Sequence, residues 1–197
     1  MSTAAVFWPV TGNDPDIDYL IDEYWSQSED DDLEDVFRRS GSSEQVMERI
    51  VKKNLHMLKE NERKHPEADE FVITCACDII KEFKPDVLAI HPAAIDAARH
   101  SSGLFTEKVD RSLDDTERWT SMIIQATKDA GTYENTNFVI MSDHGQLEIK
   151  RIINPNVILR DNGLITTDTE GNFLNWDAFC KSAALSAHVY LKNPSCT

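Results

Sequence analysis

The chain has 197 residues, of which 41% are hydrophobic, and its formal net charge at pH 7 is −15. A chain of this size and composition is expected to fold as a soluble domain with its own hydrophobic core. The negative charge excludes duplex nucleic acid and anionic membrane as expected partners, because both are bound through clustered Lys and Arg side chains. The sequence shows neither a run of roughly 20 apolar residues nor a signal peptide, so we predict a cytoplasmic protein.

Four cysteines are present, at positions 75, 77, 180 and 196. Cys75 and Cys77 form a C-x-C pair, which lacks the C-x-x-C spacing of redox and zinc motifs. Both lie in an apolar stretch with a helical pattern, so we interpret them as buried free thiols. This use of cysteine is typical of a reducing compartment.

The first half of the chain predicts a strand followed by helices. The apolar run "TAAVFW", residues 3–8, is typical of a buried strand. From residue 18 to about residue 64 the pattern is charged and helical, and Ser42 or Ser43 is a suitable N-cap. A further helix is predicted to start near Pro66 and to run to the break at Lys84–Pro85.

Two more strands and a long helix are predicted in the middle of the chain. Residues 86–91, "DVLAIH", and residues 137–141, "NFVIM", are apolar runs typical of buried strands. Between them, residues 107–130 form an amphipathic helix that ends at Gly131. Near the end, "NPNVILRDNG" predicts a short helix, "LITT" and "NFL" a hairpin, "WDAFCKSAA" a helix, and "AHVYLK" a final strand.

Apolar strands that alternate with helices indicate the α/β class. We predict a mostly parallel sheet with helices on both faces. The whole chain, residues 1–197, is interpreted as one domain, within which residues 16–66 form a helical cap.

Polar side chains follow two of the predicted strands. Asp96 and His100 come a few residues after "DVLAIH", and Asp143 and His144 come directly after "NFVIM". The i, i+4 spacing of Asp96 and His100 places both on one face of a helical turn. Asp143 and His144 converge only if the strand ends and the chain bends, which Gly145 is expected to allow.

Ligands of open α/β sheets bind at the carboxyl ends of the strands, so both Asp/His pairs are expected at the same edge. A carboxylate and an imidazole make half of a zinc site, and two ions about 4 Å apart suit phosphoryl hydrolysis. The alternative interpretations are a surface pair on a helix for Asp96 and His100, and an ordinary turn for "SDHG". The joint pattern favours a site with two metal ions.

Longer stretches of the sequence resemble a known family. "KPDVLAIHPAAIDAARHSSG", the long helix and "NFVIMSDHGQ" are similar to the alkaline phosphatase superfamily, in its branch of type I phosphodiesterases and nucleotide pyrophosphatases. "AAVFWPVTG" and "INPNVILRDNGLI" also resemble segments of bacterial members. The resemblance implies an alkaline-phosphatase-like fold, phosphate ester or nucleotide substrates, and two zinc ions, one held by Asp96 and His100 and the other by Asp143 and His144.

The family completes its site with an upstream Asp, a Thr or Ser nucleophile and a third His, for which we find no match. Thr11, in "PVTG", lacks the expected preceding pattern and is rejected as nucleophile. We therefore expect an internal fragment, incomplete at both ends and without its nucleophile, that has little or no turnover alone. Missing strands would leave an apolar sheet edge, which predicts self-association.

Other hypotheses remain open. The chain could be a non-catalytic interaction module that keeps the fold, or it could have another superfamily activity: sulfatase, phosphomutase or phosphonate hydrolase. His91, at the end of "DVLAIH", is interpreted as a residue that hydrogen-bonds a ligand carboxylate or as a structural histidine.

Overall fold

The computed structural model describes residues 1–23, 25–28, 31–183 and 185–193. It divides into two compact units, Met1–Leu147 and Glu148–Thr197. Each unit has its own secondary structure and is described separately. The interpretation of residues 1–197 as a single domain stays a prediction.

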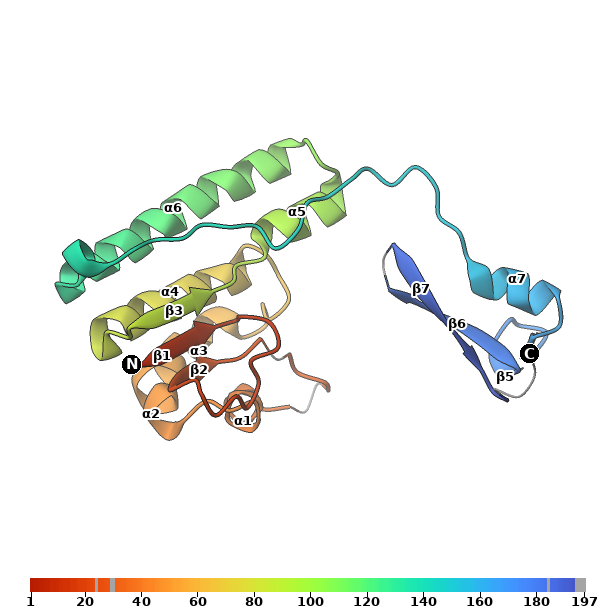
Figure 1. Ribbon diagram of the computed structural model, residues 1–197, viewed down its shortest axis with the longest axis horizontal. Coiled ribbons are helices and arrows are strands. Elements are labelled where there is room, and N and C mark those ends of the chain that lie inside the picture. Colours follow the sequence, from red (N-terminus) through yellow and green to blue (C-terminus); the bar gives the residue numbers. More distant parts are fainter. Residues whose placement is uncertain (24, 29–30, 184, 194–197) are drawn as a thin grey trace. The chain divides into compact units, whose positions relative to one another are not determined.

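The first unit is built on a parallel sheet (Figure 1). Its strands are β1 (Thr3–Val6), β2 (Tyr19–Ile21) and β3 (Val87–Ile90), in the order β2-β1-β3. Both pairings are parallel, with Ala4 opposite Tyr19 and Thr3 opposite Val87. The α/β class with a parallel sheet is therefore confirmed.

Strand β2 lies in the stretch that the sequence predicted to be helical. Leu20 and Ile21 are 2% and 0% exposed and pair with the buried strand β1. A strand of three residues is too short to show an alternating hydrophobic pattern in the sequence, so only its pairing with β1 reveals it.

Short helices follow β2 and supply much of the core. They are α1 (Leu33–Arg39), α2 (Glu44–Val46) and α3 (Lys52–Leu58), the last two joined by a π-helical turn, Met47–Val51. The Ser43 side chain caps α2 by accepting a hydrogen bond from the backbone N–H of Val46, as expected. Phe37 and Ile50 are fully buried in one cluster with Val6 of β1, so part of the predicted cap at residues 16–66 shares its core with the sheet.

Three further helices belong to the first unit, one before β3 in the chain and two after it. They are α4 (Glu67–Phe83), α5 (Ala94–Ser102) and α6 (Glu107–Ala130). Helix α4 ends at Lys84, whose φ of 49° is left-handed, and α6 ends at Gly131, whose φ is 73°. A second hydrophobic cluster joins α4, α5 and α6 through Ile73, Ala94 and Trp119. The predicted bounds of α6 are confirmed.

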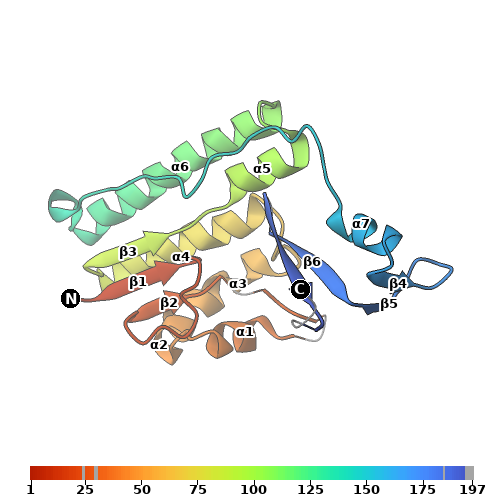
Figure 2. The same ribbon diagram turned by 45° about the vertical axis from the view of Figure 1, so that its right-hand side comes forward.

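The predicted third strand, residues 137–141, is wrong. After a 3₁₀ turn at Tyr133–Asn135 the chain runs in irregular conformation past α6 and α5 (Figures 1 and 2). Val139, Ile140 and Met141 are 82%, 78% and 71% exposed. An apolar composition permits a strand, but a parallel strand also needs a paired neighbour and covered faces, which this segment does not have in the described part of the chain.

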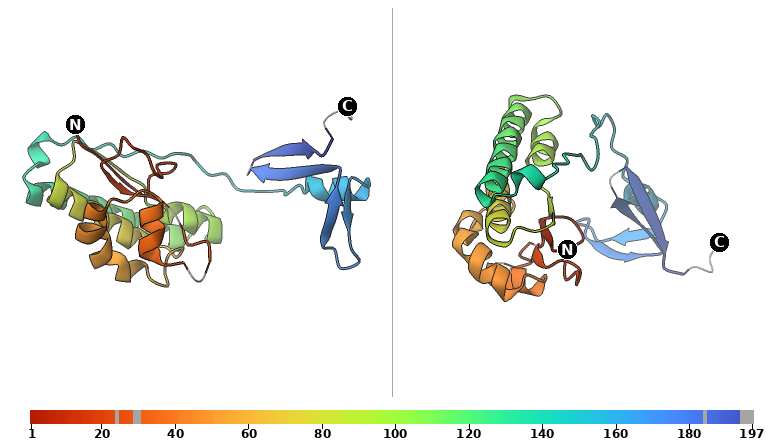
Figure 3. Two further views of the ribbon diagram at one scale, coloured as in Figure 1. Left: turned by 90° about the horizontal axis from the view of Figure 1, so that it is seen from below. Right: turned by 60° about the vertical axis from the view of Figure 1, so that its left-hand side comes forward.

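The second unit consists of a helix and two hairpins (Figure 3). Helix α7 (Pro155–Asp161) precedes the antiparallel pair β4 (Ile165–Thr167) and β5 (Phe173–Trp176), and β6 (Ala178–Ala183) pairs antiparallel with β7 (Ser186–Leu191). The predicted helix over "WDAFCKSAA" is wrong, because most of it is β6. Cys180 pairs with Val189, and its backbone N–H and carbonyl both bond the Asn156 side chain on α7. These contacts override a local pattern that favoured a helix.

The described residues bear on two further predictions, one about membrane-spanning helices and one about the cysteines. Within the residues that the structure describes, no helix has the length and hydrophobicity of a membrane span. Cys75, Cys77 and Cys180 are buried free thiols, as expected for the first two, and Cys196 lies outside the described residues. Burial raises the pKa of the Cys77 thiol to about 11.

Candidate metal centre

Asp96 and His100 lie one turn apart on helix α5. The Asp96 Oδ1 atom is 3.4 Å from the His100 Nε2 atom, so the i, i+4 spacing brings carboxylate and imidazole together as expected. The two side chains are 43% and 72% exposed. Ala94 and Ala98 on the same helix are buried, and they anchor α5 to the core while Asp96 and His100 face solvent.

A buried carboxylate holds the start of this helix. Asp69 of α4 is 2% exposed, and its Oδ1 atom accepts a hydrogen bond of 2.6 Å from the backbone N–H of Ala93, the N-cap residue of α5. Its Oδ2 atom is 2.6 Å from Nδ1 of His65, and this bond raises the pKa of His65. Sequence reasoning missed Asp69, although a lone carboxylate on the apolar face of a helix, four residues after a histidine, is a recognisable signal.

Asp143 and His144 lie in the irregular segment that follows Asn135. The Asp143 Oδ2 atom is 3.3 Å from the His144 Nε2 atom, and the side chains are 61% and 57% exposed. The chain bends at Asp143, and the Ser142 hydroxyl bonds the carbonyl of His144 at 2.5 Å. The expectation that Gly145 supplies the bend is wrong, because Gly145 is not one of the glycines with positive φ.

A long-range hydrogen bond joins the segment that carries Asp143 and His144 to helix α5. The side-chain amide of Gln146 donates to Asp96 Oδ1 at 2.8 Å, across 50 residues of sequence. Figure 2 shows the segment after α6 passing beside α5, where this contact is made. Sequence reasoning missed Gln146, and its only signal was its position two residues after His144.

His91 follows β3 directly, as predicted, but no hydrogen bond to a candidate ligand is described for it. Its backbone N–H bonds the Val6 carbonyl, and its ring lies edge-on to Trp8 with centroids 6.3 Å apart. The buried Nδ1 atom has no partner among the described residues. The proposed bond to a ligand carboxylate stays a prediction. Glu23, after β2, lies close enough to interact with His91, although burial is the larger influence and raises the pKa of Glu23.

The distances within both pairs suit a zinc ion. Two ligands at about 2.0–2.2 Å from a tetrahedral zinc ion are about 3.4 Å apart. The observed separations of 3.4 Å and 3.3 Å match this value, and carboxylate with imidazole is a donor set that zinc accepts. Across the described ranges, no group of three or more His, Cys, Asp or Glu side chains is placed to hold an ion. The residues therefore fit two half-sites with two ligands each.

Comparison with known families identifies the chain. A family model described as type I phosphodiesterase / nucleotide pyrophosphatase matches residues 1–194. No curated protein and no solved structure matches the chain. The matched range includes both Asp/His pairs, the sheet and both hairpins of the second unit. The chain therefore belongs to the type I phosphodiesterase / nucleotide pyrophosphatase family.

Proposed function

We propose that the protein is a metal-dependent hydrolase of phosphate diesters or nucleotide pyrophosphates. In this proposal Asp96 and His100 hold one divalent ion, and Asp143 and His144 hold the other. The observation that carries it is that both pairs place an oxygen and a nitrogen donor 3.3–3.4 Å apart, a separation that two ligands of one zinc ion can take. Membership of the family supports the reaction class.

The residues of this chain contribute charge and orientation. Bound zinc ions supply Lewis acidity and lower the pKa of an attacking oxygen. The carboxylates of Asp96 and Asp143 offset part of the charge of the ions, and both imidazoles must be neutral to act as ligands. Gln146 donates to Asp96 Oδ1 and so limits the rotation of that carboxylate.

The structure offers little support for a nucleophile at Thr11. Its hydroxyl donates to the Trp8 carbonyl at 2.7 Å, and the residue is 8% exposed. We therefore do not assign Thr11 as the nucleophile, and we propose that this chain alone turns substrate over slowly.

Calorimetric titration with zinc tests the ligand assignment. We expect His100→Ala and His144→Ala each to weaken zinc binding at least about tenfold, because each removes half of a two-ligand site. The matched control is His56→Ala, since His56 is exposed on α3 and bonds only the Lys53 carbonyl among its described contacts. Equal zinc affinity in all four proteins would refute the assignment.

Hydrolysis of bis-p-nitrophenyl phosphate tests the reaction. We expect weak, zinc-dependent release of p-nitrophenol that a chelator abolishes and that Asp96→Ala removes. Strong hydrolysis that persists in chelator would exclude a metal-dependent mechanism.

A second candidate is a non-catalytic module that keeps the fold. The observation that favours it is the high exposure of all four candidate ligands and the limit of two ligands per ion in the described residues. Absence of zinc binding by wild-type protein at micromolar concentration would support this candidate against the hydrolase.

A further inference from the structure

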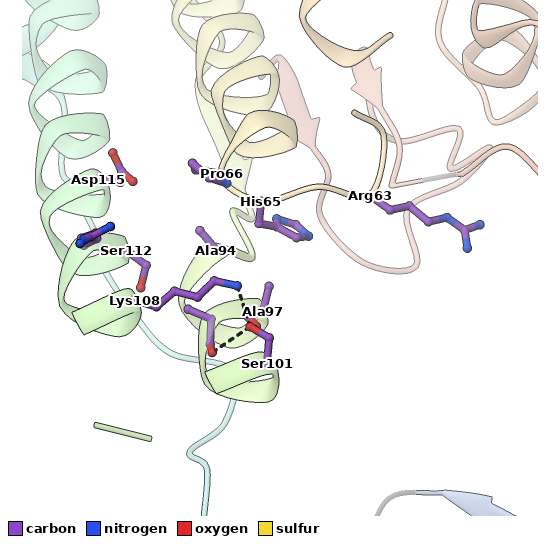
Figure 4. Close-up of a pocket in the computed structure, with 11 residues that line it drawn as sticks. Arg63, His65, Pro66, Ala94, Ala97, Ser101, Lys108, Ser112 and Asp115 are labelled. Atoms are coloured by element: carbon purple, nitrogen blue, oxygen red, sulfur yellow. Dashed lines mark hydrogen bonds between the residues drawn. The ribbon is translucent and has the colours of Figure 1, made fainter. Parts of the chain in front are cut away.

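A cavity of about 430 Å³ lies between α5, α6 and the loop that precedes α4. Figure 4 shows the facing side chains of α5 and α6, with Pro66 closing the space above them. Its volume falls in the range of small-molecule sites, about 300–1,000 Å³. The cavity, named here the α5–α6 pocket, is lined by Arg63, His65, Pro66, Ala94, Ala97, Ala98, Ser101, Lys108, Arg111, Ser112 and Asp115.

Short side chains keep this pocket open. Ala94, Ala97, Ala98 and Ser101 have the i, i+3, i+4, i+7 spacing of one face of α5. At about 100° per residue, Asp96 and His100 lie roughly a third of a turn away on the same helix. The α5–α6 pocket is therefore separate from the candidate metal centre, although both use α5.

The walls of the pocket are positively charged in a chain whose net charge is −15. Lys108 and Arg111 are both exposed on α6, and the i, i+3 spacing makes them neighbours on one face. Arg111 also pairs with Glu107 at 3.5 Å, but both side chains are exposed, and such a pair is weak enough for a phosphate to displace. The one carboxylate of the lining, Asp115, is bonded by the Arg118 guanidinium at 2.9 Å. The Arg63 guanidinium keeps its charge but points away from Pro66, because it donates a hydrogen bond to the Ser26 carbonyl (Figure 4).

Lys108 has a neutral partner that a stronger acceptor can replace. Its Nζ atom donates to the Ser101 hydroxyl at 2.8 Å across the pocket, and no carboxylate is among its described contacts. An anionic oxygen adds a Coulombic attraction to the ammonium group that the neutral hydroxyl lacks. An anion that enters the pocket therefore gains more from Lys108 than the hydroxyl does.

We propose that the α5–α6 pocket binds a small organic phosphate monoester, with its phosphate between Lys108 and Arg111. A monoester carries a charge of about −1.5 to −2 at pH 7, which matches these two cations. The apolar part of the ligand packs against the alanines of α5 and against Pro66. This site is independent of any metal ion.

Titration with phenyl phosphate in the presence of a chelator tests the proposal. The chelator removes metal ions, so binding at the candidate metal centre cannot account for the signal. Wild-type protein is expected to bind phenyl phosphate more tightly than inorganic phosphate, and not to bind phenol, with an affinity that falls as salt is raised. Calorimetry or amide chemical shifts give the dissociation constant.

Three variants locate the site. Lys108→Ala is expected to weaken phenyl phosphate binding at least fivefold, and Ala97→Leu, which fills the cavity without a change in charge, is expected to abolish it. Lys128→Ala is the matched control, because it removes the same charge from the same helix about 30 Å away and should change affinity less than twofold. Because Lys108 is exposed, its variant should fold even if Ala97→Leu does not.

Three outcomes would overturn the proposal. They are no binding by wild-type protein at low salt, equal binding by the Lys108→Ala and Lys128→Ala variants, and binding that appears only when zinc replaces the chelator. The zinc-dependent outcome would leave the proposed hydrolase intact, whereas binding in chelator supports the pocket whatever the fate of the metal centre.

Discussion

The distance between Asp and His is nearly the same in the two pairs, but the backbone that carries them is held in place very differently. Asp96 and His100 project from a hydrogen-bonded helix whose Ala94 and Ala98 are buried and whose first turn is held by Asp69. Asp143 and His144 lie in a segment, residues 139–147, for which the structure describes no backbone–backbone hydrogen bond. One pair is therefore preorganised, whereas the other lies in a segment held by side-chain bonds, from Ser142 to the His144 carbonyl and from Gln146 to Asp96.

The largest expected effect is the loss of stability when Asp69, which holds the start of α5, is replaced. Asp69→Ala leaves the N–H of Ala93 and the ring of His65 without their buried acceptor, and we expect a loss of about 3 kcal/mol in the free energy of unfolding. Asp143→Ala is the control and should change stability by no more than about 0.5 kcal/mol, because its side chain is exposed. Urea unfolding followed by circular dichroism measures both. Equal losses would show that the two segments are equally supported.

Amide hydrogen exchange compares the two segments without a mutation. The N–H of Ala98, inside α5, is expected to exchange at least about a hundredfold more slowly, relative to its intrinsic rate, than the N–H groups of residues 140–144. Protection of residues 140–144 to the level of Ala98 would indicate that this segment is paired in solution.

The hydrogen bond from Gln146 to Asp96 gives a smaller effect. Gln146→Ala should weaken zinc binding by about tenfold, because the Asp96 carboxylate loses the amide that orients it. Gln125→Ala is a suitable control, since Gln125 bonds Asp129 on the far part of α6. Zinc calorimetry on both variants measures the difference. Unchanged affinity in Gln146→Ala would show that this hydrogen bond does not orient the Asp96 carboxylate for zinc.

The smallest expected effect is a change of stability with pH, caused by the contact between His65 and Asp69. Because the hydrogen bond to Asp69 raises the pKa of His65 in the folded state, the stabilisation is complete below the unfolded pKa of about 6.5. It is lost as pH rises through the raised pKa of the folded state. The midpoint of thermal unfolding should therefore fall more steeply above pH 6.5 for wild-type protein than for His65→Gln. Parallel curves for the two proteins would contradict this assignment.

Self-association stays a prediction, and the exposed apolar residues show where contacts between copies are expected. Val139 and Ile140 are 82% and 78% exposed, and Val87 on β3 is 49% exposed. Any association of the kind expected from a bare sheet edge should involve these residues.

Local signals predicted the elements that are stabilised locally. The Ser43 cap and the Gly131 stop follow from residue type and spacing, and so do the bounds of α4 and α6. The predictions over residues 137–141 and over "WDAFCKSAA" were wrong because composition alone decided them. Pairing to a neighbour, present for Cys180 and absent from the backbone contacts described for residues 137–141, is a long-range property.

The sequence by itself determined the candidate metal ligands, because the spacing of Asp96 with His100 and the adjacency of Asp143 with His144 are local. Only the tertiary structure decided how these residues are held. The contact of Gln146 with Asp96 spans 50 residues, and that of Asp69 with Ala93 spans 24. The α5–α6 pocket likewise exists only because a helix face of alanines meets the cations of another helix. Such contacts depend on packing between elements, which no periodicity within one element records.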